Sequence, residues 1–163
     1  MKAWLKKRFK NEEGFTLVEL LAVIVILGII AAIAVPSIGN VIENSKKDAT
    51  VANAEQMIEA SRLLVTSESP NFTDGSLTIP LKKANATTDG YGLIDNGYIN
   101  SFEDTTGVDY DTASKVVVTK SADGALSYAV YLKGTEYEIE GEDEGSTVSE
   151  SEIVRKKVKG SDN

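Results

Sequence analysis

The chain has 163 residues and a formal charge of −8, and it contains neither histidine nor cysteine. The absence of these two residue types excludes histidine general bases, thiol nucleophiles and the usual transition-metal ligands, so we expect no enzyme and no cofactor. The acidic composition also argues against direct nucleic-acid binding, which requires basic surface.

The first fourteen residues are basic, unlike the rest of the chain. They contain five cations and two acids, so the remaining residues carry about −11. Because Lys and Arg beside an apolar segment stay in the cytoplasm, these cations predict a cytoplasmic N-terminus, with the bulk of the chain outside. The five cations are Lys2, Lys6, Lys7, Arg8 and Lys10.

An apolar run extends from Phe15 to Val35. As a helix it would be about 31 Å long, which matches the ~30 Å hydrocarbon core of a bilayer. It lacks the polar face of a soluble amphipathic helix, so the run predicts a membrane-spanning helix. A secretory signal peptide is an alternative, since Ala32-Ile33-Ala34 has the small-x-small pattern of a cleavage site.

Glu19 is an acid close to the start of this apolar run. An acid within a spanning helix is energetically costly, and such residues usually serve a function. Glu19 either stays hydrated at the membrane interface of a plain single-pass anchor or pairs with a positive charge. Cleavage between Gly14 and Phe15 would create such a charge, an α-amino group one helical turn from Glu19 or beside a neighbouring copy.

The segment Lys10-Asn11-Glu12-Glu13-Gly14-Phe15-Thr16-Leu17-Val18-Glu19-Leu20-Leu21 resembles the processing site of type IV prepilins and pseudopilins. The resemblance implies cleavage after Gly14 by a prepilin peptidase and methylation of the new amino terminus at Phe15. It also implies that Glu19 pairs with the terminus of a neighbouring subunit during filament assembly.

Gly28 and Pro36 match the positions between which the helices of assembled pilins often lose helical order. Both residue types favour such a loss of helical order, because Gly weakens a helix by roughly 1 kcal/mol relative to Ala and Pro removes a backbone donor. For the isolated subunit, however, we expect a continuous, bent helix.

After Pro36 the sequence predicts an α+β head. Apolar residues at spacings of three and four predict an amphipathic helix over residues 36–66. Residues 67–141 then predict an antiparallel sheet of three to four strands packed on this helix. The strands are expected at 76–81, with Pro80 at a sheet edge, and at 115–121, 125–133 and 135–140. Residues 142–163 predict a charged final edge strand or a frayed tail.

The acidic loop around residues 103–111 carries the weaker prediction of a calcium site. Asp104, Asp109 and Asp111 place oxygen ligands at close spacing, as calcium requires. The spacing matches no strict calcium motif, and an ordinary solvated acidic loop is the alternative.

The resemblance implies a structural pilin subunit. Its partners would be copies of itself in a helical filament, the prepilin peptidase and methyltransferase, and an assembly platform with its ATPase. It would span the inner or cell membrane once before assembly and lie in an extracellular filament afterwards. The alternatives are a pseudopilin of a type II secretion or competence DNA-uptake apparatus, or a membrane-anchored extracellular binding module. The missing cysteine pair favours a Gram-positive type.

Overall fold

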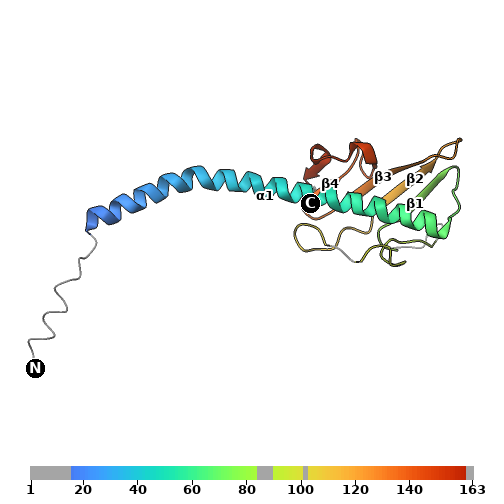
Figure 1. Cartoon of the computed structure of the whole chain (residues 1–163), viewed down its shortest axis with the longest axis horizontal. Coiled ribbons are helices and arrows are strands. Elements are labelled where there is room, and N and C mark those ends of the chain that lie inside the picture. Colours follow the sequence, from blue (N-terminus) through green and yellow to red (C-terminus); the bar gives the residue numbers. More distant parts are fainter. Residues whose placement is uncertain (1–15, 84–89, 101–102, 161–163) are drawn as a thin grey trace, which may run out of the picture. The chain divides into compact units, whose positions relative to one another are not determined.

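The computed structural model describes residues 16–83, 90–100 and 103–160 (Figure 1). The chain divides into two compact units, Met1–Ile42 and Glu43–Asn163. One helix, α1, contributes residues to both of them.

Helix α1 extends from Leu17 to Glu68 and comprises 52 residues. It continues without interruption through Gly28, Pro36 and Gly39, which confirms the predicted continuous helix. After Glu68 the backbone of Ser69 adopts a positive φ of 47°, and Pro70 follows. A left-handed residue followed by proline is a common way to end a helix.

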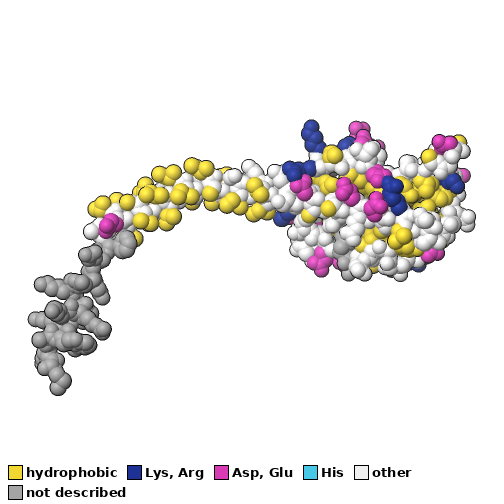
Figure 2. All heavy atoms as spheres, in the orientation of Figure 1, with side chains coloured by type: hydrophobic (Ala, Val, Ile, Leu, Met, Phe, Trp, Pro, Cys, Tyr) yellow, Lys and Arg dark blue, Asp and Glu magenta, His cyan; other side chains and the backbone are white. Residues whose placement is uncertain are grey.

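In the first unit, successive apolar side chains of the helix are exposed, and those on the face in view are yellow in Figure 2. The helix contains an 18-residue window that is apolar enough to cross a membrane, and none of this window is buried within the protein. Apolar side chains of the helix remain exposed beyond Pro36, as far as Ile42. A core helix of a soluble protein would instead be covered by other elements.

In the second unit, α1 buries one face and exposes the other, as the sequence predicts. Its buried residues recur every three or four positions, so they lie on one face of the helix. Three of them, Met57, Ile58 and Leu64, are among the largest fully buried side chains of the protein. The complete set is Thr50, Ala54, Met57, Ile58, Ala60, Ser61, Leu64 and Val65.

Over the described residues the sheet has six strands, which corrects the prediction of three to four. All pairings are antiparallel, in the order β1-β2-β3-β4-β6, and β5 pairs with β3. Strands β5 and β6 have two and three residues, and both lie within residues 142–163, where the sequence predicts a final edge strand or a frayed tail. The strands are β1 (Ser76–Pro80), β2 (Lys115–Lys120), β3 (Leu126–Lys133), β4 (Tyr137–Ile139), β5 (Val148–Ser149) and β6 (Val158–Gly160).

The core of the head lies where the inward side chains of β2 and β3 meet the apolar face of α1. Val116 pairs with Val130 and Val118 pairs with Tyr128, and all four side chains are buried. Leu126, which alternates along β3 with the buried Tyr128 and Val130, is 39% exposed. It is the first residue of β3 beside the hairpin turn, where the core ends.

Strand β1 forms an edge of the sheet, as Pro80 predicts. Both ends of its outer side are occupied by backbone hydrogen bonds. Ser76 and Thr73 each donate to the other's carbonyl, at 2.9 and 3.0 Å, and Leu93 N–H donates to the Pro80 carbonyl at 3.1 Å. These bonds leave little free edge for pairing with another strand.

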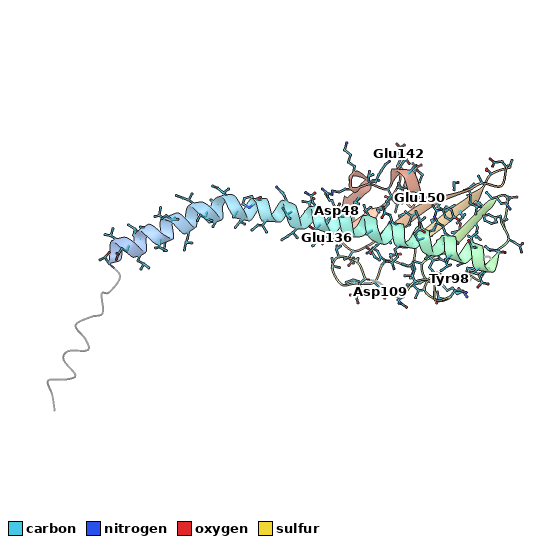
Figure 3. All side chains as sticks on the ribbon, in the orientation of Figure 1. Asp48, Tyr98, Asp109, Glu136, Glu142 and Glu150 are labelled. Carbon is cyan, nitrogen blue, oxygen red and sulfur yellow. The ribbon has the colours of Figure 1, made fainter. Side chains whose placement is uncertain are left out.

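The segment from β5 to β6 is folded, and β6 is an edge strand of the sheet, so residues 148–160 follow the predicted edge strand and not the alternative of a frayed tail. It contains the short 3-10 helices η2 (Glu150–Glu152) and η3 (Arg155–Lys157). Two ion pairs join it to α1: Arg62 of the helix contacts Glu150, and Arg155 of η3 contacts Asp48 of the helix (Figure 3). Buried side chains of Val148, Ile153 and Val158 fix the same segment to the core.

Candidate functional site

The first turn of α1 is closed by a reciprocal pair of contacts between Thr16 and Glu19. The Oε2 atom of Glu19 accepts hydrogen bonds from the backbone N–H and the hydroxyl of Thr16, both at 2.8 Å. In return, the backbone N–H of Glu19 donates to Thr16 Oγ1 at 3.2 Å. This is a capping box, with threonine at the N-cap and glutamate three residues later.

The capping box gives the acid a structural reason to occupy the start of an apolar helix. The first N–H groups of a helix lack partners within it, and the N-terminal end of the helix dipole favours negative charge. Glu19 meets both demands. Our sequence interpretation considered the charge of Glu19 and missed the role of Thr16, although the pattern Thr16-Leu17-Val18-Glu19 signals such a cap.

One oxygen of Glu19 remains available within this arrangement. Both Thr16 donors contact Oε2, and no other side chain or N–H in the described part of the chain is seen to donate to Oε1. The carboxylate is exposed. Glu19 can therefore accept a further hydrogen bond, for example from an amino group, without losing its cap.

Of the other predicted processing and assembly residues, the structure describes Gly28 and Pro36 but not Gly14 and Phe15. Gly14 and Phe15 lie outside the described residues, so cleavage and methylation there stay predictions. Gly28 and Pro36 both lie inside α1, and a Cβ atom at Gly28 would meet nothing within 4 Å. The space around Gly28 is thus free for a neighbouring helix. Loss of helical order between the two positions in a filament also stays a prediction.

The carboxylate of Asp104 organises the acidic loop from inside. Its Oδ1 atom accepts from the Thr106 N–H at 2.8 Å, the Thr106 hydroxyl at 2.5 Å and the Val108 N–H at 3.3 Å. Its Oδ2 atom accepts from the Thr135 N–H at 2.6 Å. Burial raises the pKa of Asp104, but the four hydrogen bonds outweigh burial and lower the pKa to about 2.

The structure does not bring the three calcium candidates together as one site. Asp104 uses both oxygens inside the protein, Asp109 accepts from Lys82 Nζ at 2.5 Å, and Asp111 accepts from the Ala113 N–H at 2.7 Å. Within the described ranges, no group of three or more Asp, Glu, His or Cys side chains is placed to hold a metal ion. The acids of this loop satisfy protein donors instead.

Comparison with known proteins gives two matches. Residues 9–35 match the family model of the prokaryotic N-terminal methylation motif. The chain is also 31% identical over 93 residues to the type IV major fimbrial protein FimA of Dichelobacter nodosus, an alignment that covers 50% of this chain and 60% of the relative. No solved structure matches the chain.

The motif and the structure agree about the first unit. The matched residues 9–35 include the predicted processing site, the capped Glu19 and most of the exposed apolar part of α1. The similarity to a fimbrial subunit extends beyond the length of the motif. The chain is thus similar to a type IV fimbrial protein over half of its own length, and it spans about 60% of the length of that relative.

Proposed function

We propose that this protein is the structural subunit of a type IV pilus-like filament, assembled through its N-terminal helix. The observation that carries the proposal is the exposed apolar surface of α1, which extends from Leu17 to Ile42. So large an apolar surface requires a covering partner. Lipid covers it before assembly, and the helices of neighbouring copies cover it in the filament.

Processing prepares the end of this helix for assembly. A prepilin peptidase cuts after Gly14, and the new amino group at Phe15 is methylated, which leaves its positive charge in place. The charged amine of one subunit then meets the carboxylate of Glu19 in a neighbour. The use of Oε2 by both Thr16 donors supports this step, because the amine can bind Oε1 while Thr16 keeps Oε2.

The second unit forms the outer surface of the filament. The chain beyond residue 14 carries about −11, so the heads are strongly acidic. Before assembly, the five cations of the first fourteen residues hold the N-terminus in the cytoplasm and the head outside. The assembly platform and its ATPase supply the work of moving subunits from the membrane into the filament.

Mass spectrometry of the protein purified from its native cell tests the proposal directly. We expect a mature chain that begins with N-methylated Phe15. An intact Met1 terminus, or cleavage after Ala34 as for a secretory signal peptide, contradicts the pilin assignment. Electron microscopy of the cell surface then separates the candidate functions: long filaments indicate a pilus, and their absence despite correct processing indicates a pseudopilus.

A further inference from the structure

Residues 154–160 form a basic segment in an otherwise acidic head. They contain four cations and no acid, whereas the chain beyond residue 14 carries about −11. A local excess of positive charge attracts anionic partners. The four cations, which lie in η3 and in β6, are Arg155, Lys156, Lys157 and Lys159.

Two of these four cations are used within the protein. Arg155 Nε donates to Asp48 Oδ1 at 2.6 Å, and Lys159 Nζ donates to a backbone carbonyl at 2.7 Å. Among the described residues, Lys156 and Lys157 form no ion pair. Their charges are therefore available to a partner.

The 3-10 helix η3 turns these two lysines away from Asp48. Successive side chains of a 3-10 helix lie about 120° apart. Because Arg155 faces Asp48 of α1, Lys156 and Lys157 point in the other two directions. Lys156 is exposed and Lys157 is half-buried. A lysine stem can lie along the protein surface in this way while its ammonium group reaches a partner.

Val154 adds an exposed apolar side chain directly before η3. It is 50% exposed, although the neighbouring Ile153 and Val158 are buried. Its backbone is extended, so Ile153 points into the head and Val154 points outward. Exposed aliphatic side chains beside lysines are typical of segments that lie on a membrane surface. There the apolar atoms enter between the headgroups, and the ammonium groups bind anionic lipid.

The course of the chain keeps η3 close to the membrane. The exposed apolar part of α1, from Leu17 to Ile42, is about 39 Å long, close to the ~40–45 Å of a bilayer with its headgroups. Asp48 follows Ile42 by only six residues, which span about 9 Å in a helix and at most about 22 Å in any conformation. The ion pair between Arg155 and Asp48 thus holds η3 within reach of the headgroups.

We propose that Val154, Lys156 and Lys157 bind the outer surface of the membrane through anionic phospholipid headgroups before the subunit enters a filament. The two ammonium groups contact headgroup phosphates, and Val154 packs between the headgroups. Electrostatic attraction to a membrane falls off within a Debye length of roughly 8–10 Å, so acids elsewhere on the head do not cancel it. The inference rests on the membrane-anchored stage of the proposed function and adds a second attachment, which is lost when the subunit leaves the bilayer.

Fluorescence of the full-length protein in lipid vesicles tests this contact. The natural chain contains no cysteine, so an environment-sensitive dye on Val154→Cys reports on this position alone. Two vesicle types are compared, phosphatidylcholine alone and phosphatidylcholine mixed with phosphatidylglycerol. We expect the emission to move to shorter wavelength when phosphatidylglycerol is present and to return at high salt. The dye control is Leu63→Cys, which is 57% exposed and lies fifteen residues, about 22 Å, beyond Asp48 on α1. Its emission should be the same in both vesicle types.

The lysine charges are tested by Lys156→Gln with Lys157→Gln in the labelled Val154→Cys protein. Glutamine keeps a polar side chain but carries no charge to attract a phosphate. We therefore expect this double substitution to abolish the response of the dye to phosphatidylglycerol. Equal melting temperatures with and without the two substitutions show that the head is still folded.

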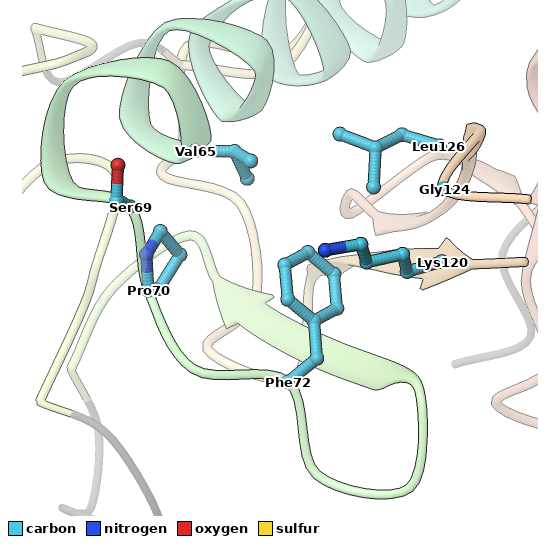
Figure 4. A pocket seen from close by; sticks show the side chains of 7 residues that line it. All are labelled: Val65, Ser69, Pro70, Phe72, Lys120, Gly124 and Leu126. Atoms are coloured by element: carbon cyan, nitrogen blue, oxygen red, sulfur yellow. The ribbon is translucent and has the colours of Figure 1, made fainter. Parts of the chain in front are cut away.

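The matched control removes two lysines elsewhere on the head, Lys83→Gln with Lys120→Gln. Both lysines are exposed, so the change in net charge and in exposed cations is the same. Lys120 lines an open pocket beside Val65, at the C-terminal end of α1 and therefore distant from Asp48 (Figure 4). This control should keep the full response to phosphatidylglycerol.

Equal emission from the label at residue 154 in both vesicle types, or equal loss of the response in both lysine variants, overturns the lipid contact and leaves the pilin function standing. An unchanged response in Lys156→Gln with Lys157→Gln overturns the contact as well. If that variant also forms fewer filaments, the two lysines bind the acidic head of a neighbouring copy instead. The expected response, in a protein whose native form lacks a methylated Phe15, supports the lipid contact and contradicts the pilin function.

Discussion

Glu19 and Thr16 share three hydrogen bonds across the first turn of α1, and all contacts to the carboxylate use its Oε2 atom. The carboxylate therefore closes the first turn of its own helix. In the proposed filament the same carboxylate would also meet the amino terminus of a neighbour, and Thr16 would position it for that contact. These two roles of Glu19 can be separated by mutation.

Replacing Thr16 by Val tests the positioning role. Valine keeps the shape of threonine but loses the hydroxyl that both donates to and accepts from Glu19. We expect Thr16→Val to insert into the membrane and to yield fewer filaments than the wild type, measured as sheared pilin per cell. Thr16→Ser restores the hydroxyl and should recover the wild-type yield. Equal yields for valine and wild type would show that the capping box has no part in assembly.

Substitutions at Glu19 separate its charge from its capping. Glu19→Val should leave membrane insertion intact and abolish filaments, because the carboxylate that carries the charge and accepts from Thr16 is lost, although the backbone N–H of residue 19 can still donate to Thr16 Oγ1. Glu19→Gln keeps an oxygen that can accept from Thr16 but cannot attract an amino terminus by charge. We expect Gln to fail in assembly as Val does, as judged by electron microscopy beside a membrane-fraction blot. Normal filaments from Glu19→Gln would rule out the ion pair.

The parts of the fold that the sequence predicts well are those with long, regular patterns. Helix α1 is predicted to about Thr66 and ends at Glu68, because its apolar residues keep one spacing from Pro36 onward. Strands β2 and β3 are also predicted to within one residue, since Ala122-Asp123-Gly124 marks their turn.

The features that the sequence does not reveal depend on contacts between distant residues. Strand β5 exists because Val148 pairs with Val130, and η3 is positioned by the ion pair between Arg155 and Asp48. Asp104 looks like a metal ligand when only neighbouring acids are considered. In the fold, Asp104 also lies beside Thr135, which is distant in sequence. The Thr135 N–H donates to the Oδ2 atom of Asp104, which a calcium ion would otherwise bind.

Asp104→Asn should destabilise the head. The amide nitrogen of Asn would face either the Thr135 N–H or the three donors at Oδ1, so at least one donor loses its acceptor. Asp104 is only 8% exposed, and loss of its charge-assisted bonds should cost about 2 kcal/mol. Asp111→Asn is the matched control, because Asp111 is exposed and accepts from one N–H through Oδ1. Thermal unfolding of the full chain in detergent measures both, and equal melting temperatures would contradict the role given to Asp104.

The stability of the head should also fall in acid. The pKa of Asp104 is lowered to about 2, whereas an unfolded Asp titrates near ~3.9. Its contribution is therefore fully present above about pH 4 and is lost as the pH falls towards about 2. Arg155 lowers the pKa of Asp48, and Lys47 lowers that of Glu43, so these groups act with the same sign. As the pH falls from about 6 to 2, the melting temperature of Asp104→Asn should fall less steeply than that of the wild type. Parallel curves of melting temperature against pH would exclude Asp104 as a source of the acid sensitivity.

At Gly134 the β3–β4 turn packs against residues of the acidic loop. A Cβ atom at Gly134 would lie 2.7 Å from the Tyr137 carbonyl oxygen, 3.1 Å from Tyr110 Cε1 and 3.2 Å from Asp104 Cβ. The first of these contacts is with the backbone, and the Gly134 N–H already donates to the same Tyr137 carbonyl at 3.0 Å. The turn therefore cannot make room without weakening its own hydrogen bond.

We expect Gly134→Ala to cost about 1–3 kcal/mol, the usual effect of overpacking. Gly160→Ala is the control, since a Cβ at Gly160 meets nothing within 4 Å. Because the shift would move Asp104 away from Thr135, the double variant Gly134→Ala with Asp104→Asn should lose less stability than the sum of the two single variants. Chemical denaturation of the four proteins measures this coupling. Strict additivity would mean that the loop and the turn are independent, and that Gly134 acts only through its own backbone.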